Sequence, residues 1–135
     1  MTAIAKPTPL PNEVSRPYWE AAAEGRLVLQ RCADCNTVRN YPRLLCAVCY
    51  SEAVNWLPAS GSGVVHSWTV AHHAFHPAFA AELPYTLVTI DLAEGVRALG
   101  RWSAQTVPIM NQRVQGAFVA REGGGADLVF GPVVD

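Results

Sequence analysis

The chain has 135 residues and a formal net charge of −1, and charged residues make up only 16% of it. This length allows one ordinary domain, or a small metal-stapled module followed by a compact barrel. No stretch approaches the roughly 20 unbroken apolar residues that cross a bilayer, so we expect a soluble protein without a membrane partner.

Residues 1–15 are expected to form an N-terminal arm. Pro7, Pro9 and Pro11 fix φ and remove backbone donors, so the arm should run extended across a surface or be disordered. The start of the chain lacks the apolar segment of a secretory signal, which favours a cytoplasmic location. In that reducing compartment, cysteines bind metals more often than they form disulfides.

A short helix is predicted after Ser15, with Pro17 in its first turn and Gly25 at its end. Residues 18–24 are good helix formers. Tyr18 and Trp19 are large aromatic residues for so short a helix. We therefore expect them to anchor into another surface, either inside the chain or on a partner protein.

Two C-x-x-C pairs, Cys32/Cys35 and Cys46/Cys49, are separated by ten residues. A strand at residues 27–30 leads into the first pair, and each pair offers two thiolates to one tetrahedral ion. The pattern predicts structural zinc, although iron binds the same four thiolates. A pair of disulfides or redox-active cysteines is the alternative. Four thiolates leave no open position where a metal-bound water is activated, so the metal should act as a staple.

After Ser60-Gly61-Ser62-Gly63 the pattern changes to β, and we place the boundary between residues 16–58 and residues 59–135 here. Runs of β-branched and aromatic residues predict five strands at 64–70, 85–92, 96–102, 113–120 and 128–130. A hairpin is expected at Glu94-Gly95 and a loop tip at residues 123–125. The fold class is thus mainly β: an N-terminal helix and zinc ribbon, then a five-stranded OB-fold barrel, with an SH3-like barrel as second choice.

Four histidines, His66, His72, His73 and His76, cluster within eleven residues. They suggest either polar loop residues or a metal or proton-relay site. The loop interpretation is favoured, because the adjacent His72 and His73 would point to opposite faces of a strand. A self-contained enzyme using His72, His73 and His76 is the least favoured function.

Arg31, Arg39 and Arg43 surround the cysteine pairs and suggest either phosphate binding or a solvated ribbon surface. A single-stranded nucleic-acid-binding module, with bases stacked on the tryptophans, is an alternative function. However, Lys6 is the single lysine and acids slightly outnumber bases, so the basic stripe that displaces phosphate counterions is not visible. A charge-poor and apolar surface instead indicates a partner protein.

The order of these signals resembles a bacterial and archaeal family of acyl-CoA-associated proteins, long called a domain of unknown function, that join a rubredoxin-like zinc ribbon to an OB fold. The resemblance covers residues 16 to about 132. Its matching segments are Pro17-Tyr18-Trp19-Glu20, Gly25-Arg26-Leu27, Gln30-Arg31-Cys32, Tyr41-Pro42-Arg43, Cys46-x-x-Cys49, Gly61-x-Gly63-x-Val65-x-Ser67-Trp68-Thr69-Val70, Pro84-Tyr85 and Glu94-Gly95-Val96-Arg97. Asn36 replaces the usual glycine after the second cysteine, and Asn111-Gln112 replaces a glycine-containing turn, which leaves the strand register there open.

The resemblance implies a non-catalytic accessory subunit that binds a thiolase-like enzyme, an aldolase or a hydratase acting on acyl-CoA esters. It would stabilise that enzyme and help form its acyl-CoA pocket. The ribbon and the helix with Tyr18 and Trp19 would dock, and Arg31 and Arg43 would touch the CoA phosphates. No motif of a catalytic nucleophile or nucleotide loop occurs in the sequence, which agrees with this expectation.

Overall fold

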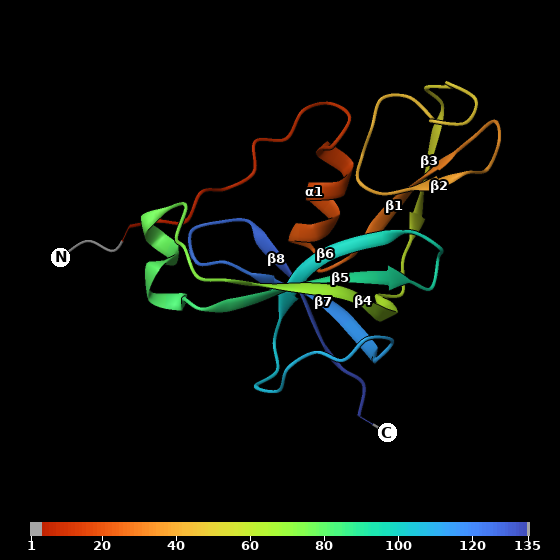
Figure 1. The fold of residues 1–135 in the computed structure, drawn as a ribbon. Helices are drawn as coiled ribbons and strands as arrows, with labels where there is room; N and C mark the ends of the chain where they lie inside the picture. The colour runs from red at the N-terminus through yellow and green to blue at the C-terminus, as the bar shows by residue number, and fades with distance from the viewer. Residues whose placement is uncertain (1–3, 135) are drawn as a thin grey trace.

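Two β-sheets, one small and open and the other closed into a barrel, make up the chain in the computed structural model, which describes residues 4–134 (Figure 1). The prediction of a mainly β fold with one helix before a five-stranded barrel is confirmed. The small sheet has the order β2-β1-β3 and the barrel the order β4-β5-β6-β8-β7. The elements are α1 (Arg16–Ala23), β1 (Val28–Cys32), β2 (Val38–Arg39), β3 (Val54–Pro58), β4 (Ser62–Ala71), the 3-10 helix η1 (Pro77–Glu82), β5 (Tyr85–Leu92), β6 (Arg97–Trp102), β7 (Arg113–Ala120) and β8 (Ala126–Pro132).

The barrel strands follow the predicted ranges closely, and β5 and β7 begin and end at the predicted residues. β8 is longer than the predicted 128–130, because it pairs with β7 along its whole length. Three elements were not predicted, the short strand β2 among them. β3 is recognisable only through its pairing with β1, and η1 lies in a segment that was interpreted as a loop.

The barrel interior is closed by alternating apolar residues around the ring of Phe130, which is fully buried. Gly100 and Gly116 face this ring from two strands, and a Cβ atom at either glycine would lie 2.6 or 2.5 Å from a ring carbon. The register left open before β7 is settled by Asn111, which adopts φ 66 and donates its N–H to the Val65 carbonyl. Asparagine therefore takes the left-handed conformation that glycine usually supplies.

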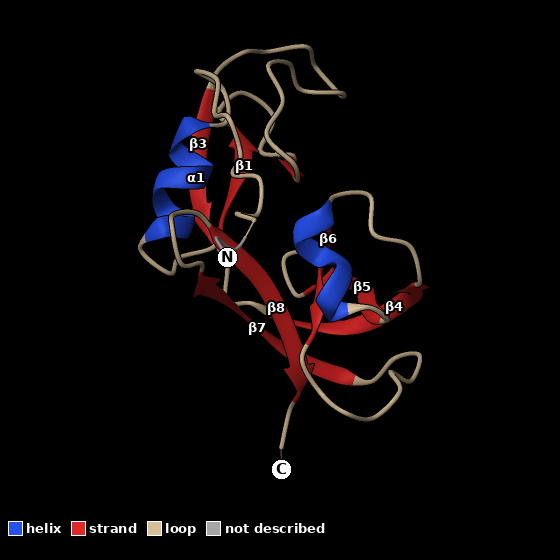
Figure 2. Cartoon of the chain, turned by 90° about the vertical axis from the view of Figure 1, so that its left-hand side faces the viewer, coloured by secondary structure: helices blue, strands red, loops and turns tan. Residues whose placement is uncertain are grey.

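Helix α1 lies beside β1 of the small sheet (Figure 2), and it also contacts β7 of the barrel. Gly25 ends it as predicted: its φ is 79, and the following Arg26 N–H donates to the Ala21 carbonyl. Tyr18 is buried in the core shared by the helix and the barrel, and its ring meets Phe118 of β7 edge-on. The helix thus joins the two sheets.

A second connection joins the ribbon to the barrel at a seam between β6 and β8. These parallel strands pair at Arg101 and Trp102 of β6. On this side of β6, the backbone groups that precede Arg101 therefore have no strand of residues 4–134 beside them. Two side chains from the loop after β2 take their place. The Asn40 amide donates to the Arg97 carbonyl at 3.0 Å, and the Tyr41 hydroxyl accepts the Leu99 N–H at 2.8 Å.

The arm runs extended along the barrel from residue 4 and enters α1 through a turn in which Asn12 and Ser15 bond reciprocally. The Pro7 carbonyl accepts a hydrogen bond from Arg121 at 2.6 Å. The arm prediction for residues 1–3 and the barrel prediction for residue 135 lie outside the described residues. Within residues 4–134, no helix has the length and apolar character needed to cross a membrane.

Candidate metal centre and its surroundings

The four predicted cysteines converge on one point at the tip of the small sheet. Their sulfur atoms all lie within 4.8 Å of one another, with 3.5 Å between Cys32 and Cys49 and 3.6 Å between Cys35 and Cys46. Zn–S bonds of roughly 2.3 Å in a tetrahedron place sulfur atoms about 3.8 Å apart. The cluster therefore fits a tetrahedral metal ion of the size of zinc or iron, and within residues 4–134 it is the one such group of ligating side chains.

The two C-x-x-C segments build the centre by the same backbone device. Asn36 donates its N–H to the Cys32 carbonyl, and Tyr50 donates to the Cys46 carbonyl, both at 2.9 Å. Both donors have a positive φ, 65 for Asn36 and 60 for Tyr50. The left-handed residue folds each segment so that its two sulfurs point to one side. Asn36 thus adopts the left-handed conformation that glycine usually supplies.

The electrostatics of the cluster call for a cation. Backbone N–H groups of Cys49 and Val48 lower the pKa of the Cys46 thiol to about 6, and a backbone N–H of Cys35 lowers that of Cys32. These thiols ionise readily. Four adjacent thiolates would repel one another, so a divalent ion is the partner that makes the fully ionised set stable.

The loop that leads into the second cysteine pair is held from beneath by two buried polar residues. Gln30 accepts the Arg43 N–H at 2.8 Å, and Arg39 donates to the Arg43 carbonyl at 3.1 Å. Arg39 is 7% exposed, and its Nε and Nη1 atoms have no partner among the described residues. Because it is buried, Arg39 is not available as a surface phosphate ligand.

The other two arginines do not come together. Arg31 follows Gln30 on β1 and therefore points to the opposite face of the small sheet, whereas Arg43 lies on the Gln30 side. Arg43 is exposed and Arg31 is half-buried. The structure thus offers two separate cationic groups on the ribbon.

The histidines also separate. His66 on β4 lies 3.3 Å from Asp91 on β5, while His72 and His73 are exposed in the loop after β4. His76 has a structural role, because its Nδ1 accepts the Ala78 N–H and caps η1 at 3.1 Å. Among residues 4–134 they form no group that could hold a metal.

The second cysteine pair presents an apolar surface that the sequence analysis did not single out. Four side chains within seven residues are largely exposed: Leu44 by 56%, Leu45 by 45%, Val48 by 66% and Tyr50 by 75%. We call these four residues the knuckle patch. The sequence signal for this surface was the run of apolar residues around Cys46 and Cys49. These apolar side chains have no core to pack against, because the two cysteine sulfurs turn toward the metal.

Two family profiles match the chain. Residues 19–55 match the family described as "ChsH2, rubredoxin-like zinc ribbon domain", and residues 56–121 match "ChsH2, C-terminal OB-fold domain". A solved structure described as the Ltp2-ChsH2(DUF35) aldolase superposes with a TM-score of 0.84 and 34% identity, covering 93% of this chain and 99% of that one. A Sulfolobus solfataricus protein of unknown function from the DUF35 family shares the fold, with a TM-score of 0.61 at 10% identity, over 90% of this chain and 86% of that one.

Two curated relatives are longer than the chain. A probable enoyl-CoA hydratase alpha subunit from Thermomonospora curvata is 44% identical over 92 residues, which are 68% of this chain and 28% of that protein. A DUF35 domain-containing scaffold protein from Methanocaldococcus jannaschii is 33% identical over 76 residues, 56% of this chain and 53% of that protein. The chain thus spans about a quarter of the first relative and about half of the second.

Proposed function

Because the chain belongs to the ChsH2 family of rubredoxin-like zinc-ribbon and OB-fold proteins, we propose that it is a non-catalytic accessory subunit of an enzyme acting on acyl-CoA esters. In this proposal it binds a thiolase-like enzyme, an aldolase or a hydratase in the cytoplasm. It stabilises that enzyme and helps form its acyl-CoA pocket. Zinc on Cys32, Cys35, Cys46 and Cys49 keeps the ribbon folded.

The names of the relatives support a subunit role. One relative is described as a hydratase alpha subunit, one as a scaffold protein, and the solved structure as an aldolase that combines Ltp2 with ChsH2. The saturated cysteine cluster points the same way, because four thiolates leave a metal no position for substrate or water.

The knuckle patch is the observation that carries the proposal. Exposed apolar side chains gathered in one segment mark protein contacts, since leaving them in water is unfavourable. The metal fixes the backbone of this segment in advance, so docking would cost little conformational entropy. A rigid apolar tip, held at the end of a ribbon away from the barrel core, suits insertion into a groove of a larger enzyme.

The helix and the arginines take secondary places in this proposal. The Tyr18 ring is packed in the core of the chain. Trp19 is half-buried at the surface and is therefore the better docking residue of the two. Arg31 and Arg43 remain separate candidates for contact with CoA phosphates, because Arg31 points to the face of the small sheet opposite Gln30, whereas the Arg43 backbone is bonded to Gln30.

The test is a pull-down of the tagged full chain from its native cell extract, with metal analysis of the eluate. We expect a thiolase-like, aldolase or hydratase protein to co-elute with about one zinc per chain. Val48→Asp should abolish co-elution while the metal content stays unchanged. Val119→Asp is the matched control, since Val119 is 53% exposed on β7 of the barrel.

The outcomes separate clearly. Loss of the partner in Val48→Asp alone supports the knuckle patch as the docking surface. Equal retention of the partner in both variants would overturn this assignment. Co-elution of nucleic acid without any enzyme would overturn the accessory-subunit proposal itself.

A further inference from the structure

Each half of the metal centre contains a hydroxyl residue, placed two positions after the second cysteine of its pair. In the first half the Thr37 carbonyl accepts the Cys32 N–H at 2.9 Å. In the second half the Ser51 carbonyl accepts the Cys46 N–H at 3.0 Å. Thr37 and Ser51 therefore occupy equivalent positions, and their backbones close the two halves in the same way.

The two hydroxyl groups, however, have different partners. The Thr37 Oγ1 atom lies 3.1 Å from the sulfur of Cys35. The Ser51 hydroxyl instead donates to an Asp34 carboxylate oxygen in the first half, and it accepts the Ala53 N–H at 3.0 Å. The Ser51 side chain thus ties the two halves together, whereas the Thr37 side chain contacts a metal ligand.

The contact between Thr37 and Cys35 has a fixed direction once a metal is bound. A cysteine that ligates a metal is a thiolate, so its sulfur has no proton and can only accept a hydrogen bond. The hydroxyl must then be the donor, and a bond to an ionised acceptor is stronger than one between neutral groups. Thr37 is half-buried, and a β-branched side chain has few χ1 rotamers, so this geometry is held at a low entropic cost.

Cys35 is one of two ligands that face solvent. Cys32 and Cys46 are fully buried, while Cys35 and Cys49 are exposed. A thiolate is a nucleophile, and an exposed thiolate meets electrophiles that a buried one does not. A hydrogen bond to the sulfur withdraws electron density from it, and outer-shell contacts of this kind tune how a ligand binds its metal.

We propose that Thr37 is a positioning residue of the metal centre, whose hydroxyl donates to the Cys35 thiolate and keeps this exposed sulfur on the metal and unreactive toward electrophiles. The hydroxyl of Ser51 is engaged by Asp34, so Cys49 depends on the metal and the backbone for its protection. The inference rests on the proposed four-cysteine centre, but it is independent of the partner enzyme.

The experiment is alkylation of the full, zinc-loaded chain with iodoacetamide, in which a thiolate sulfur takes the carbamoylmethyl group and iodide leaves. Mass spectrometry of the digested chain gives separate initial rates for Cys35 and Cys49. Thr37→Val keeps the shape of the side chain and removes the donor. It should raise the rate at Cys35 about three- to tenfold, as expected for one lost hydrogen bond, and leave the rate at Cys49 unchanged. Thr37→Ser keeps a donor and should restore the slow rate.

A second variant shows what a merely structural effect looks like. Ser51→Ala removes the tie between the two halves and should raise the rates at Cys35 and Cys49 together. Cobalt in place of zinc gives an independent optical signal. The thiolate-to-cobalt charge-transfer band should move to longer wavelength in Thr37→Val, because the sulfur becomes richer in electrons, and should stay in place in Thr37→Ser.

Metal analysis separates failure of this inference from failure of the centre. An unaltered chain that bound no zinc would refute the four-cysteine centre, and the role of Thr37 with it. If zinc is bound but Cys35 reacts equally fast in the unaltered chain and in Thr37→Val, the proposal for Thr37 alone is overturned. A parallel rise at Cys35 and Cys49 in Thr37→Val would also overturn it, since that result indicates general loosening of the ribbon.

Discussion

Replacing Tyr41 by phenylalanine tests whether the ribbon holds the open edge of the barrel through one hydroxyl. This hydroxyl accepts the Leu99 N–H at 2.8 Å and lies 3.4 Å from the Leu99 carbonyl, so the shorter contact carries most of the interaction. A net hydrogen bond contributes about 0.5–1.5 kcal/mol, and a buried N–H left without an acceptor costs more. Leu99 is 49% exposed, so water replaces part of the lost contact.

We therefore expect Tyr41→Phe to lower the free energy of unfolding by about 1 kcal/mol, which corresponds to about 3–5 °C in Tm for a chain of this size. The assay is thermal and urea unfolding of the metal-loaded chain followed by circular dichroism. Hydrogen exchange of the Leu99 amide, which should become faster, reports on the contact directly.

Tyr50→Phe is the control, because the Tyr50 side chain is 75% exposed and its hydroxyl bonds no described residue. It should leave both Tm and the Leu99 exchange rate unchanged. If Tyr41→Phe behaved like Tyr50→Phe in both measurements, the Tyr41 hydroxyl would not support β6, and the account of the seam would be wrong.

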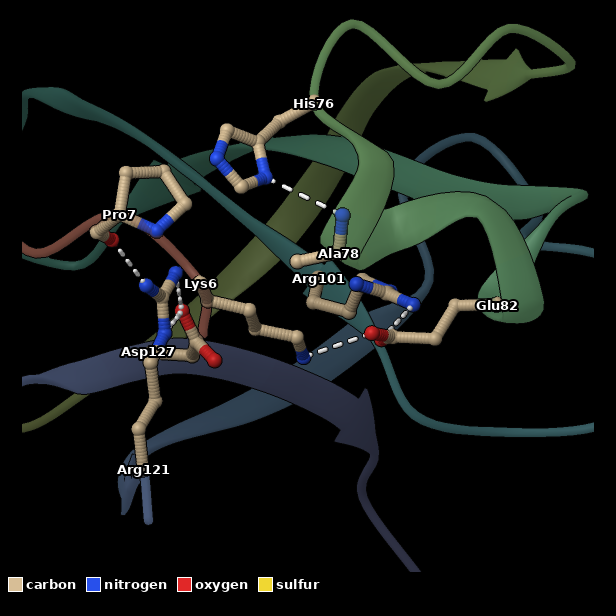
Figure 3. A network of polar contacts seen from close by, with 8 residues as sticks. All are labelled: Lys6, Pro7, His76, Ala78, Glu82, Arg101, Arg121 and Asp127. Carbon is tan, nitrogen blue, oxygen red and sulfur yellow. Dashed lines mark hydrogen bonds and ion pairs between the residues drawn. The ribbon is translucent and has the colours of Figure 1, made fainter. Parts of the chain in front are cut away.

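Three further predictions concern the core, the metal and the arm. Gly116→Ala should destabilise the chain by about 2–3 kcal/mol in urea unfolding, since its Cβ would lie 2.5 Å from the Phe130 ring, and Phe130→Leu should partly rescue it. Cys46→Ser, or chelation of the metal, should abolish stoichiometric zinc binding in metal analysis and expose the ribbon amides to hydrogen exchange; full retention of zinc would contradict the four-thiolate centre. Lys6 of the arm, and then Arg101, lower the pKa of Glu82 below its usual 4.5. The ion pair between Glu82 and Lys6 that holds the arm (Figure 3) is therefore complete above that pH and is lost as the pH falls through the lowered value. Proteolysis of the arm by an acid-active protease should therefore accelerate in the unaltered chain as the pH falls through the lowered pKa of Glu82, while Glu82→Gln should be cleaved quickly on both sides of it.

The metal centre could be predicted from the sequence because it is built from local patterns. Each cysteine pair closes on itself within a few residues, so the spacing of Cys32 with Cys35 and of Cys46 with Cys49 already implies the geometry. The strands β5 and β7 were predictable for a similar reason, since alternation of apolar residues along one strand records which face is buried.

Contacts between distant segments were decided only by the tertiary structure. Tyr41 and Leu99 are 58 residues apart, and neither residue carries a local sign that a side chain would replace a strand at the seam. The internal burial of Tyr18 has the same origin, because the same aromatic helix could equally have faced a partner protein. Local chemistry therefore determined the metal site and the strands, whereas the seam and the exposed knuckle patch arose from how the two sheets pack together.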